Sequence, residues 1–384
     1  MGAQTQQVTT SAPRLAQAIA VALLGFAFAR TLWTQVTWIT AGGDAWGSGD
    51  WLINYAGGFV RRGLVGEILL GLVPPGRTVI WVLGAFQVAL LVPLFIHAFA
   101  ALRRAGWSWY GLALAAGPAG VAFYGWAPGA AFHKELLAFD ALLLLTWSSR
   151  CDRARRAMAF ALASLVAFLF AAFSWEVTVC LLPAFVYVLW RRRRAFSLAV
   201  TVAFIVTGSV ALVLSGLFHG DAFVVSRVCD RIQEQQLSPT LCTGAVDALA
   251  RTVSYQLTVV TSLFPVLLGQ IVFLLLGLVP ALVSQWTRHN LVWTILIVFP
   301  LLLLFPIGQD WGRWTSMIVI AVTICMTASK EPVQSLVDWN RLLAIAYATL
   351  WGINVFAARP IDYFAGFPRA AWRTLVGILE RLVS

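Results

Sequence analysis

Charged residues are scarce in this sequence, and their scarcity excludes a soluble globular domain. Asp, Glu, Lys and Arg together make up 11% of the chain, whereas 60% of its residues are hydrophobic. Soluble domains carry roughly 25% charged and 45–50% apolar residues. Apolar runs of about twenty residues recur from end to end, and each is long enough to cross a bilayer as a helix. The composition therefore predicts an all-α, polytopic helical membrane protein with a single membrane domain over residues 1–384.

Signals for metal and nucleotide binding are also lacking. The chain has only 4 His and 5 Cys, too few in combination for a metal site, so we expect no metal. It has no Walker motif, no GxGxxG after a strand and no GxSxG elbow, so we expect no nucleotide cofactor. The formal net charge of +11 comes from arginines dispersed among predicted helix ends, so it indicates no nucleic-acid partner.

The apolar runs predict about eleven membrane-spanning helices. The first run is too long for a signal peptide and no small-residue cleavage motif follows it, so we expect it to remain as a membrane helix. Residues 1–14 precede it as a polar cytoplasmic tail, and residues 358–384 form a tail that lies in the membrane interface. The predicted spans are 15–38, 78–101, 107–126, 135–147, 157–173, 176–190, 196–217, 257–284, 291–306, 314–328 and 342–357.

Loop charges orient these spans. If the N-terminus is cytoplasmic, Lys and Arg are more numerous in the cytoplasmic loops than in the outer loops before the C-terminal tail, as membrane proteins favour. The run Arg191–Arg194 directly follows an apolar span and is explained by the same preference. Residues 39–77 then form the first extracytoplasmic loop, and residues 218–256 form the longest later one.

Two cysteines support this orientation. Cys229 and Cys242 flank twelve residues of the outer loop 218–256. A pair of cysteines in one exported polar loop predicts a disulfide that pins the loop. Cys151, Cys180 and Cys325 lie at a cytoplasmic end or within predicted spans, and none has such a partner.

The first outer loop carries the densest set of reactive side chains. Its glycines let the backbone approach a ligand closely, and paired arginines can hold a phosphate with two hydrogen bonds each. Trp46 and Trp51 offer platforms for a sugar, although an aromatic belt at the membrane surface is the commoner explanation. The candidate residues of this loop are Asp44, Asp50, Asn54, Arg61, Arg62 and Glu67.

Three further polar clusters fall on the same predicted side. The spans next to them, 135–147 and 314–328, are short for a bilayer, so we expect these charges to lie below the membrane surface in one outward cavity. Each cluster also has a simpler explanation, such as an ion pair at a helix start or a turn cap. The clusters are His133-Lys134-Glu135 with Asp140 beyond it, Trp175-Glu176, and Gln309-Asp310-Trp311-Gly312-Arg313.

Such a cavity suits the transfer of a sugar from a polyprenyl-phosphate or diphosphate carrier to an acceptor hydroxyl. A carboxylate would remove the proton from the hydroxyl, and we expect Asp50 in this role with Asp44 in reserve. Cations would stabilise the departing phosphate, for which we expect Arg61, Arg62 and Arg313. We expect Lys134, Glu135, Glu176 and Asp310 to shape the site, with His133, Asn54 and Glu67 beside them.

Three segments also carry a family resemblance: Asn54–Glu67, the Cys229…Cys242-Thr243-Gly244-Ala245 loop, and Asp310-Trp311-Gly312-Arg313-Trp314. Over most of its length the chain resembles a group of bacterial multi-pass proteins associated with surface-polysaccharide and O-antigen gene clusters. The resemblance implies a bacterial inner-membrane protein with a periplasmic active face. Its partners would be a polyprenyl-linked sugar donor, a glycan or lipid-linked acceptor, and membrane lipids.

More broadly, the chain is similar to two architectures of lipid-dependent enzymes, the C-type glycosyltransferases and the O-antigen polymerases. The first likeness implies a catalytic carboxylate in the first outer loop, a position that Asp44 and Asp50 fit. The chain departs from that group because it has no adjacent acidic pair and no soluble C-terminal domain. It departs from the polymerases because its loop 218–256 carries few arginines.

Two other function classes stay open at the level of sequence. A transporter that flips the same lipid-linked sugars would need charged groups reachable from both sides and an internal repeat, and neither is evident. A non-catalytic assembly subunit would tolerate alanine at every cluster. The sequence also leaves open whether single sugars or repeat units are transferred.

Overall fold

The structure is a computed structural model that describes residues 11–192, 196, 198–328, 333–353 and 366–383. Apart from one isolated β-bridge between Ser284 and Ser335, helices are the regular elements of this part of the chain. The prediction of an all-α protein is therefore confirmed. Predicted features that lie outside the described residues are Arg193, Arg194, Lys330, most of the tail 1–14, the end of the span 342–357 and residues 358–365 of the C-terminal tail.

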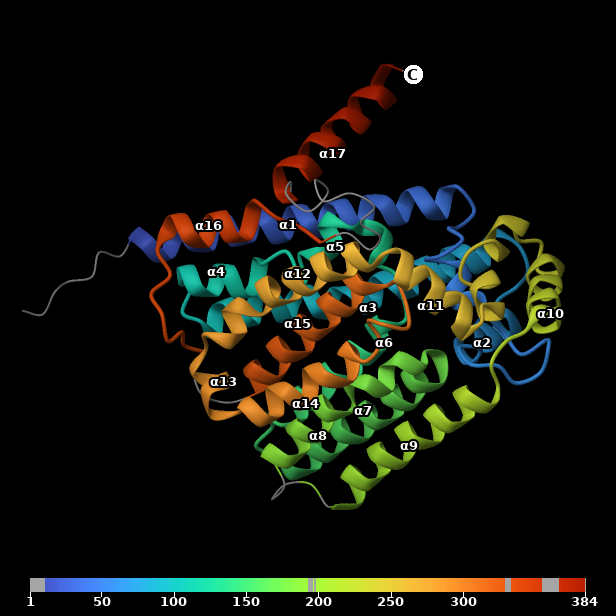
Figure 1. Ribbon diagram of the computed structural model, residues 1–384, viewed down its shortest axis with the longest axis horizontal. Coiled ribbons are helices and arrows are strands. Elements are labelled where there is room, and N and C mark those ends of the chain that lie inside the picture. The colour runs from blue at the N-terminus through green and yellow to red at the C-terminus, as the bar shows by residue number, and fades with distance from the viewer. Residues whose placement is uncertain (1–10, 193–195, 197, 329–332, 354–365, 384) are drawn as a thin grey trace, which may run out of the picture.

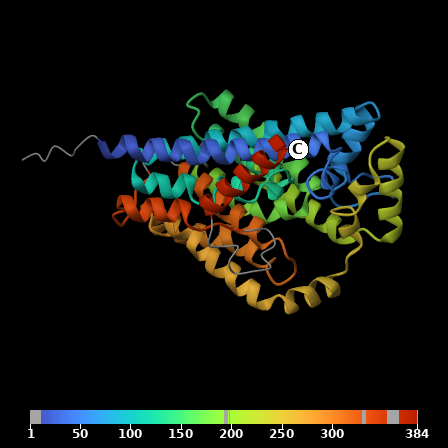
Figure 2. The same ribbon diagram turned by 90° about the horizontal axis from the view of Figure 1, so that it is seen from above.

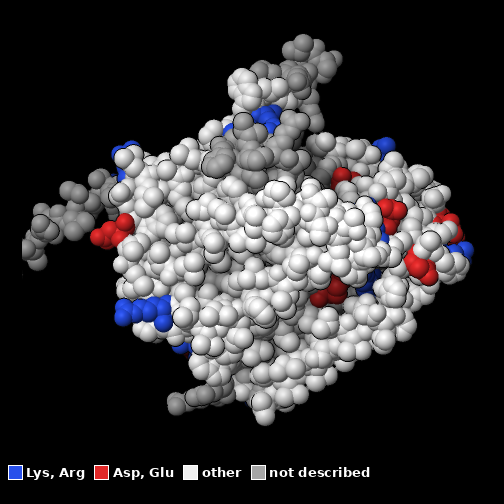
Figure 3. All heavy atoms as spheres, in the orientation of Figure 1, with Lys and Arg blue, Asp and Glu red and all other residues white. Residues whose placement is uncertain are grey.

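Six helices of the described residues are long and apolar enough to cross a membrane. These helices are α1 (Ser11–Thr40), α3 (Arg77–Arg104), α7 (Ala154–Ser174), α9 (Leu198–Leu217), α12 (Phe264–Leu282) and α15 (Trp311–Ala328). On the face that Figure 3 presents, charged side chains gather toward the two ends of the molecule and on α17 at the top, and leave a broad uncharged area between them. Helix α9 exposes several large apolar side chains, which suits contact with lipid. The chain is thus a helical membrane protein.

The other five predicted spans form shorter or interrupted helices, so eleven continuous spans are not established. The region 107–126 divides into α4 and α5, because Gly117 and Pro118 end the first helix and Gly120 turns the chain. The region 176–190 begins with a 3₁₀ turn, η3, before Pro183 enters α8. These elements are α4 (Trp109–Ala116), α5 (Phe123–Trp126), α6 (Glu135–Ser148), η3 (Glu176–Leu181), α8 (Leu182–Arg191), α14 (Leu291–Leu302) and α16 (Arg341–Thr349).

Helices α6 and α15 form the centre of the bundle. Almost all residues of both are buried, and α15 packs against α3, α6, α8, α12 and α14. Helix α1 runs along the long axis of the molecule in both ribbon views (Figures 1 and 2). The short α13 (Gln285–His289) lies at one end, whereas α2 (Leu64–Leu72) and α10 (Ala222–Glu234) lie at the other, which we call the cap end.

At the cap end, the two predicted outer loops pack on each other. The backbone N–H of Ala245 donates to the carbonyl of Ala45 over 3.1 Å, and that of Gly76 donates to Gln235 over 2.8 Å. The side-chain amide of Gln235 in turn donates to the carbonyl of Leu70 over 3.2 Å. These bonds tie the later loop to both ends of the first, so the two loops form one cap.

The cap is fastened further by a disulfide and by a close backbone approach. A disulfide joins Cys229 in α10 to Cys242, with 5.9 Å between their Cα atoms. Gly57 lies against α10, where a Cβ atom would come within 2.9 Å of the Cα of Val224. Only glycine allows the first loop to approach α10 this closely. The other three cysteines form no disulfide.

The described part of the predicted C-terminal tail is the helix α17 (Gly366–Val383). Its first turn docks through Phe367, whose ring lies 5.1 Å from that of Phe26 in α1 and 5.8 Å from that of Trp126 in α5. Beyond this contact the helix projects away from the bundle (Figure 1). The tail therefore joins the protein body beside α1.

Buried amides hold the segment before α6 in place. The side-chain amide of Gln87 in α3 donates to the carbonyls of Gly47 and Phe132, each over 2.8 Å, and accepts a 2.6 Å bond from Gln35 in α1. All of these groups are shielded from water. Gln87 therefore links two membrane helices to the first loop and to the approach to α6.

Replacing Gln87 by leucine should lower the stability of the whole molecule. The change leaves two carbonyls and the Gln35 amide unpaired, and each buried unpaired group costs roughly 1–3 kcal/mol. We expect Gln87→Leu to reduce the free energy of unfolding by about 3 kcal/mol, measured from the midpoint of denaturation in detergent. The control is Gln233→Leu on the exposed face of α10, which should change stability by less than about 0.5 kcal/mol. Equal midpoints for the two variants would contradict this role.

Candidate active site

Asp50 lies on the 3₁₀ turn η1 (Gly49–Leu52) of the first loop and is buried against the start of α6. The Lys134 Nζ is 3.7 Å from its Oδ1, and the His133 Nδ1 is 3.8 Å from its Oδ2. The next residue in the turn, Trp51, donates its indole N–H to the carbonyl of Phe132 over 2.7 Å. The turn and the start of α6 therefore form one unit that carries Asp50, His133 and Lys134.

The arginine pair follows in the same loop and faces Glu176. Arg62 binds this carboxylate with two hydrogen bonds, Nη2–Oε1 at 2.6 Å and Nε–Oε2 at 2.9 Å, and Arg61 Nη1 lies 3.3 Å from Oε1. Arg62 has a φ of 74°, a left-handed conformation that costs a residue with a side chain about 1–3 kcal/mol. The Lys134 Nζ donates to the Arg62 carbonyl over 2.7 Å. Glu176 thus holds the side chain of Arg62 and Lys134 holds its backbone carbonyl, and together they keep the residue in its strained conformation.

The third part of the cluster is Arg313, in the first turn of α15. Its Nη2 and Nε bind the two oxygens of Glu135 at 2.7 and 3.2 Å, and its Nη1 binds Asp310 Oδ2 at 2.9 Å. Its guanidinium also lies 5.1 Å above the ring of Trp175, the neighbour of Glu176. Side chains from four distant segments therefore meet in one cluster.

Charges within this cluster balance. Glu176 compensates Arg61 and Arg62 in part, Glu135 and Asp310 share Arg313, and Asp50 faces Lys134. Four cations and four anions therefore cancel when His133 is neutral. The cations are Arg61, Arg62, Lys134 and Arg313, and the anions are Asp50, Glu135, Glu176 and Asp310.

Burial and pairing shift the proton affinities in opposite directions. Burial alone would raise the pKa of Asp50, but Lys134, His133 and Arg62 outweigh it and hold that pKa well below its usual range. Burial lowers the pKa of Lys134 despite the nearby carboxylate of Asp50. Burial would also lower the pKa of Arg62, but Glu176 more than compensates and raises it. Asp50 is therefore a permanent anion at neutral pH and Arg62 a permanent cation.

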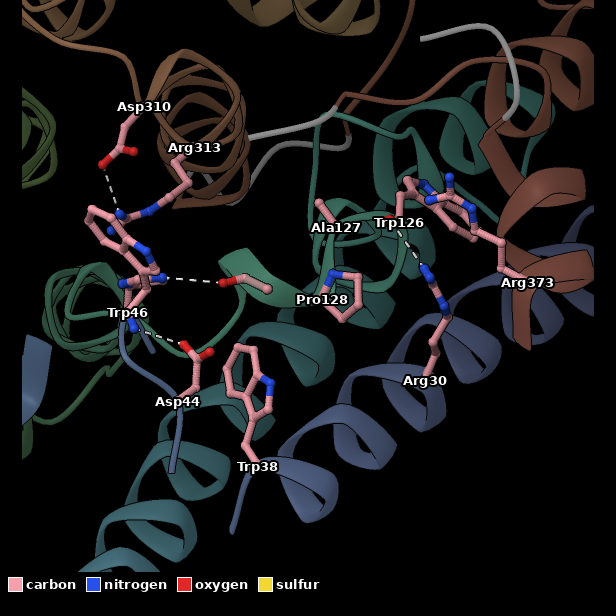
Figure 4. A pocket seen from close by; sticks show the side chains of 12 residues that line it. Arg30, Trp38, Asp44, Trp46, Trp126, Ala127, Pro128, Asp310, Arg313 and Arg373 are labelled. Carbon is pink, nitrogen blue, oxygen red and sulfur yellow. Dashed lines mark hydrogen bonds and ion pairs between the residues drawn. The ribbon is translucent and has the colours of Figure 1, made fainter. Parts of the chain in front are cut away.

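A pocket of about 370 Å³ adjoins this cluster. Figure 4 shows Asp310, Arg313 and Asp44 on one side of it and Arg30 and Arg373 on the other. Its wall brings together α1, the first loop, the segment before α6, the start of α15, and α17. The lining residues are Arg30, Trp38, Asp44, Trp46, Trp126, Ala127, Pro128, Gly129, His133, Asp310, Arg313 and Arg373.

Of the twelve site residues named from the sequence, four line this pocket: Asp44, His133, Asp310 and Arg313. Six are members of the adjoining cluster but do not line the pocket: Asp50, Arg61, Arg62, Lys134, Glu135 and Glu176. Two lie elsewhere in the cap. Asn54 donates to the carbonyl of Val228 over 3.4 Å, and Glu67 accepts from the N–H of Tyr55 over 2.9 Å, so both shape the loop.

The carboxylate of Asp44 lies in the pocket wall and is held there by backbone hydrogen bonds. Its Oδ1 accepts the backbone N–H groups of Trp46 at 2.9 Å and Gly47 at 2.6 Å. These two bonds fix the side chain through one oxygen. Asp50, by contrast, is 4% exposed and faces Lys134 and His133.

Sequence reasoning missed Arg30, Trp38, Trp126 and Arg373 as lining residues. Arg30 carried a usable signal, because an arginine inside an apolar span is costly and is a functional candidate by default. Trp38 and Trp126 stand at the ends of predicted spans, where tryptophan is common for other reasons. Arg373 carried no signal, because only the docking of α17 brings it to the pocket. No group of His, Cys, Asp and Glu in the described residues has the arrangement of a metal site.

A double-mutant cycle should reveal strong coupling between Arg62 and Glu176. Breaking a buried ion pair leaves one charge uncompensated at a cost of roughly 3–5 kcal/mol. We expect Arg62→Gln and Glu176→Gln each to destabilise the protein, and the double variant to recover about 2–3 kcal/mol relative to their sum. The control pair is Arg227 with Asp230, which is half exposed and should couple by less than about 1 kcal/mol. Additive effects at Arg62 and Glu176 would show that their contact does not exist.

Comparisons with protein-family models, curated proteins and solved structures found no match to this chain. Any functional conclusion therefore depends on the chemistry of the pocket and its adjoining cluster.

Proposed function

We propose that this protein is a membrane glycosyltransferase or polymerase of bacterial envelope polysaccharide. It would transfer sugar from a polyprenyl-phosphate or diphosphate carrier to a glycan or lipid-linked acceptor, in the pocket beneath the cap. One observation carries the proposal: a single pocket in an apolar helical bundle combines carboxylates, guanidinium groups and three tryptophans. Carboxylates can accept protons, guanidinium groups bind phosphate, and aromatic rings stack on sugars.

The reaction needs a base that reaches the acceptor hydroxyl. A carboxylate takes the hydroxyl proton as the acceptor oxygen bonds to the anomeric carbon, and the bond from that carbon to the phosphate oxygen breaks. The electron pair leaves with the phosphate, which remains on the lipid carrier. Asp44 lines the pocket and is fixed through one oxygen, so it is our candidate for the base.

This assignment reverses the order of preference that the sequence suggested. Asp50 does not line the pocket, whereas His133 does, and its carboxylate faces Lys134. Its lowered pKa also makes it a weak proton acceptor. We assign it the positioning of His133, whose ring lies in the pocket wall. Asp310 is a second pocket carboxylate, but its Oδ2 already accepts from Arg313.

The proposal places the pocket on the periplasmic face of the inner membrane. The cap end carries the disulfide between Cys229 and Cys242, and disulfides persist in the oxidising periplasm but not in the cytosol. The carrier would deliver the sugar within the bilayer, so the protein would need no soluble nucleotide site.

Substitution of the base should abolish transfer without unfolding the protein. We expect Asp44→Asn to slow transfer of labelled sugar from a polyprenyl-phosphate donor by at least ~100-fold, the usual range for loss of a general base. The same variant should fail to restore surface polysaccharide, seen on a gel, in a strain that lacks the gene. The matched control is Asp247→Asn, an exposed carboxylate of the cap, which should retain full activity.

Three results would contradict parts of the proposal. Normal polymer from Asp44→Asn, expressed as well as the control, would exclude this carboxylate as the base. Purified protein that moves a lipid-linked sugar across liposomes without altering it would instead identify a transporter. Normal surface polysaccharide after alanine substitution of Asp44, His133 and Asp310 together would indicate an assembly subunit.

A further inference from the structure

Arg30 is a cation of the pocket wall that lies within the membrane helix α1. It lies ten residues before the end of α1, about 15 Å along the helix from the cap end at the usual rise per residue. Its Nη1 donates to the carbonyls of Gly125 and Trp126, where α5 touches α1. These neutral groups orient the guanidinium but do not cancel its charge. Among the described residues, no carboxylate pairs with Arg30.

Arg373 presents a second positive charge to the same part of the pocket. Its helix, α17, is docked on α1 and α5 through Phe367, so its position depends on the body of the protein. The two guanidinium groups are close enough to repel each other, and the described residues supply no carboxylate between them. Figure 4 places both on the side of the pocket away from Asp44 and Asp310.

A third donor lies in the pocket wall beside these arginines. The indole of Trp126 is 9% exposed, and its Nε1–H has no hydrogen-bond partner in the described residues. Buried donors are almost always paired, so an unpaired one in a pocket wall calls for an acceptor that the protein itself does not supply. Two guanidinium groups and an indole N–H together match an oxyanion.

The arginines of the adjoining cluster differ from Arg30 and Arg373, because carboxylates already compensate their charge. Arg61, Arg62 and Arg313 are each bound to carboxylates, so the phosphate role expected for them from the sequence would require breaking buried ion pairs. Arg30 and Arg373 need no such rearrangement. The uncompensated positive charge of the pocket therefore belongs to them.

We propose that Arg30, Arg373 and the Trp126 indole form the binding site for the phosphate of a polyprenyl carrier, which enters sideways from the bilayer. The identification of the carrier rests on the proposed transfer reaction, whereas the anion site rests on the three donors alone. Exposed apolar side chains flank the site along both helices that supply the arginines: Val36 on α1, and Trp372 and Leu375 on α17. A ligand with a long apolar tail could contact these exposed side chains, whereas free phosphate could not.

The test measures carrier binding without any transfer step. Purified full-length protein in detergent is mixed with polyprenyl monophosphate, and native mass spectrometry counts the bound lipid. The variants are Arg30→Gln, Arg373→Gln, the double variant and Trp126→Phe, with Arg341→Gln at the start of α16 as the matched control. We expect each single arginine variant to weaken binding about tenfold and the double variant to abolish it, while Arg341→Gln binds like wild type.

Three competitors identify the source of the phosphate. We expect polyprenol, which lacks phosphate, and inorganic phosphate, which lacks the tail, to leave binding unchanged, and phosphatidylglycerol to compete only weakly. Equal binding by wild type and the double variant would overturn the anion site, while the transfer reaction could still be tested through Asp44. Arginine-dependent binding of phosphatidylglycerol with the same affinity would overturn the carrier assignment.

Discussion

A fully buried charge in a membrane-embedded bundle is costly unless it is paired, and this constraint organises the cap end of the protein. Four cations and four anions from four distant segments cancel one another beneath the two packed loops. Each of these groups alone would cost several kcal/mol in such surroundings. The pairing fixes the positions of η1, α6, η3 and α15 relative to one another, because removing any one segment leaves its partners uncompensated.

The same constraint separates two kinds of charged residue in the pocket and the cluster that adjoins it. Arg62 and Arg313 are committed to carboxylates, so they act as fixed supports for the wall. Asp44 and Arg30 are held by backbone groups instead, which orient a side chain while leaving its charge available. A site that must bind an anion and move a proton needs residues of the second kind, mounted on residues of the first.

Composition and apolar runs were enough to predict a helical membrane protein, because burial in lipid demands both. They could not place the break between α4 and α5, since hydropathy does not register that Gly117–Gly120 turns the chain inside the bundle. The polar clusters were visible in the sequence because charges are rare there. Their pairing was not, because whether Arg62 meets a phosphate or Glu176 depends on contacts across more than a hundred residues.

The different surroundings of Asp50 and Asp44 were also beyond the reach of the sequence. Both carboxylates lie in one glycine-rich loop, and only the direction of the 3₁₀ turn decides which of them faces Lys134 and which faces the pocket. Arg30, in contrast, could have been singled out from its place in an apolar span. Its neighbour Arg373 could not, because the contact depends on the docking of α17 through Phe367.

The convergence of distant charges is tested most directly by a cross-link between two of them. Arg62→Cys and Glu176→Cys would be combined in a protein whose free cysteines, Cys151, Cys180 and Cys325, are replaced by serine, and treated with a short bifunctional maleimide. We expect an intramolecular cross-link, identified by peptide mass spectrometry, and none when Arg62→Cys is paired with Arg341→Cys. If both cysteines react singly with maleimide yet never link, the charges do not meet and the account fails.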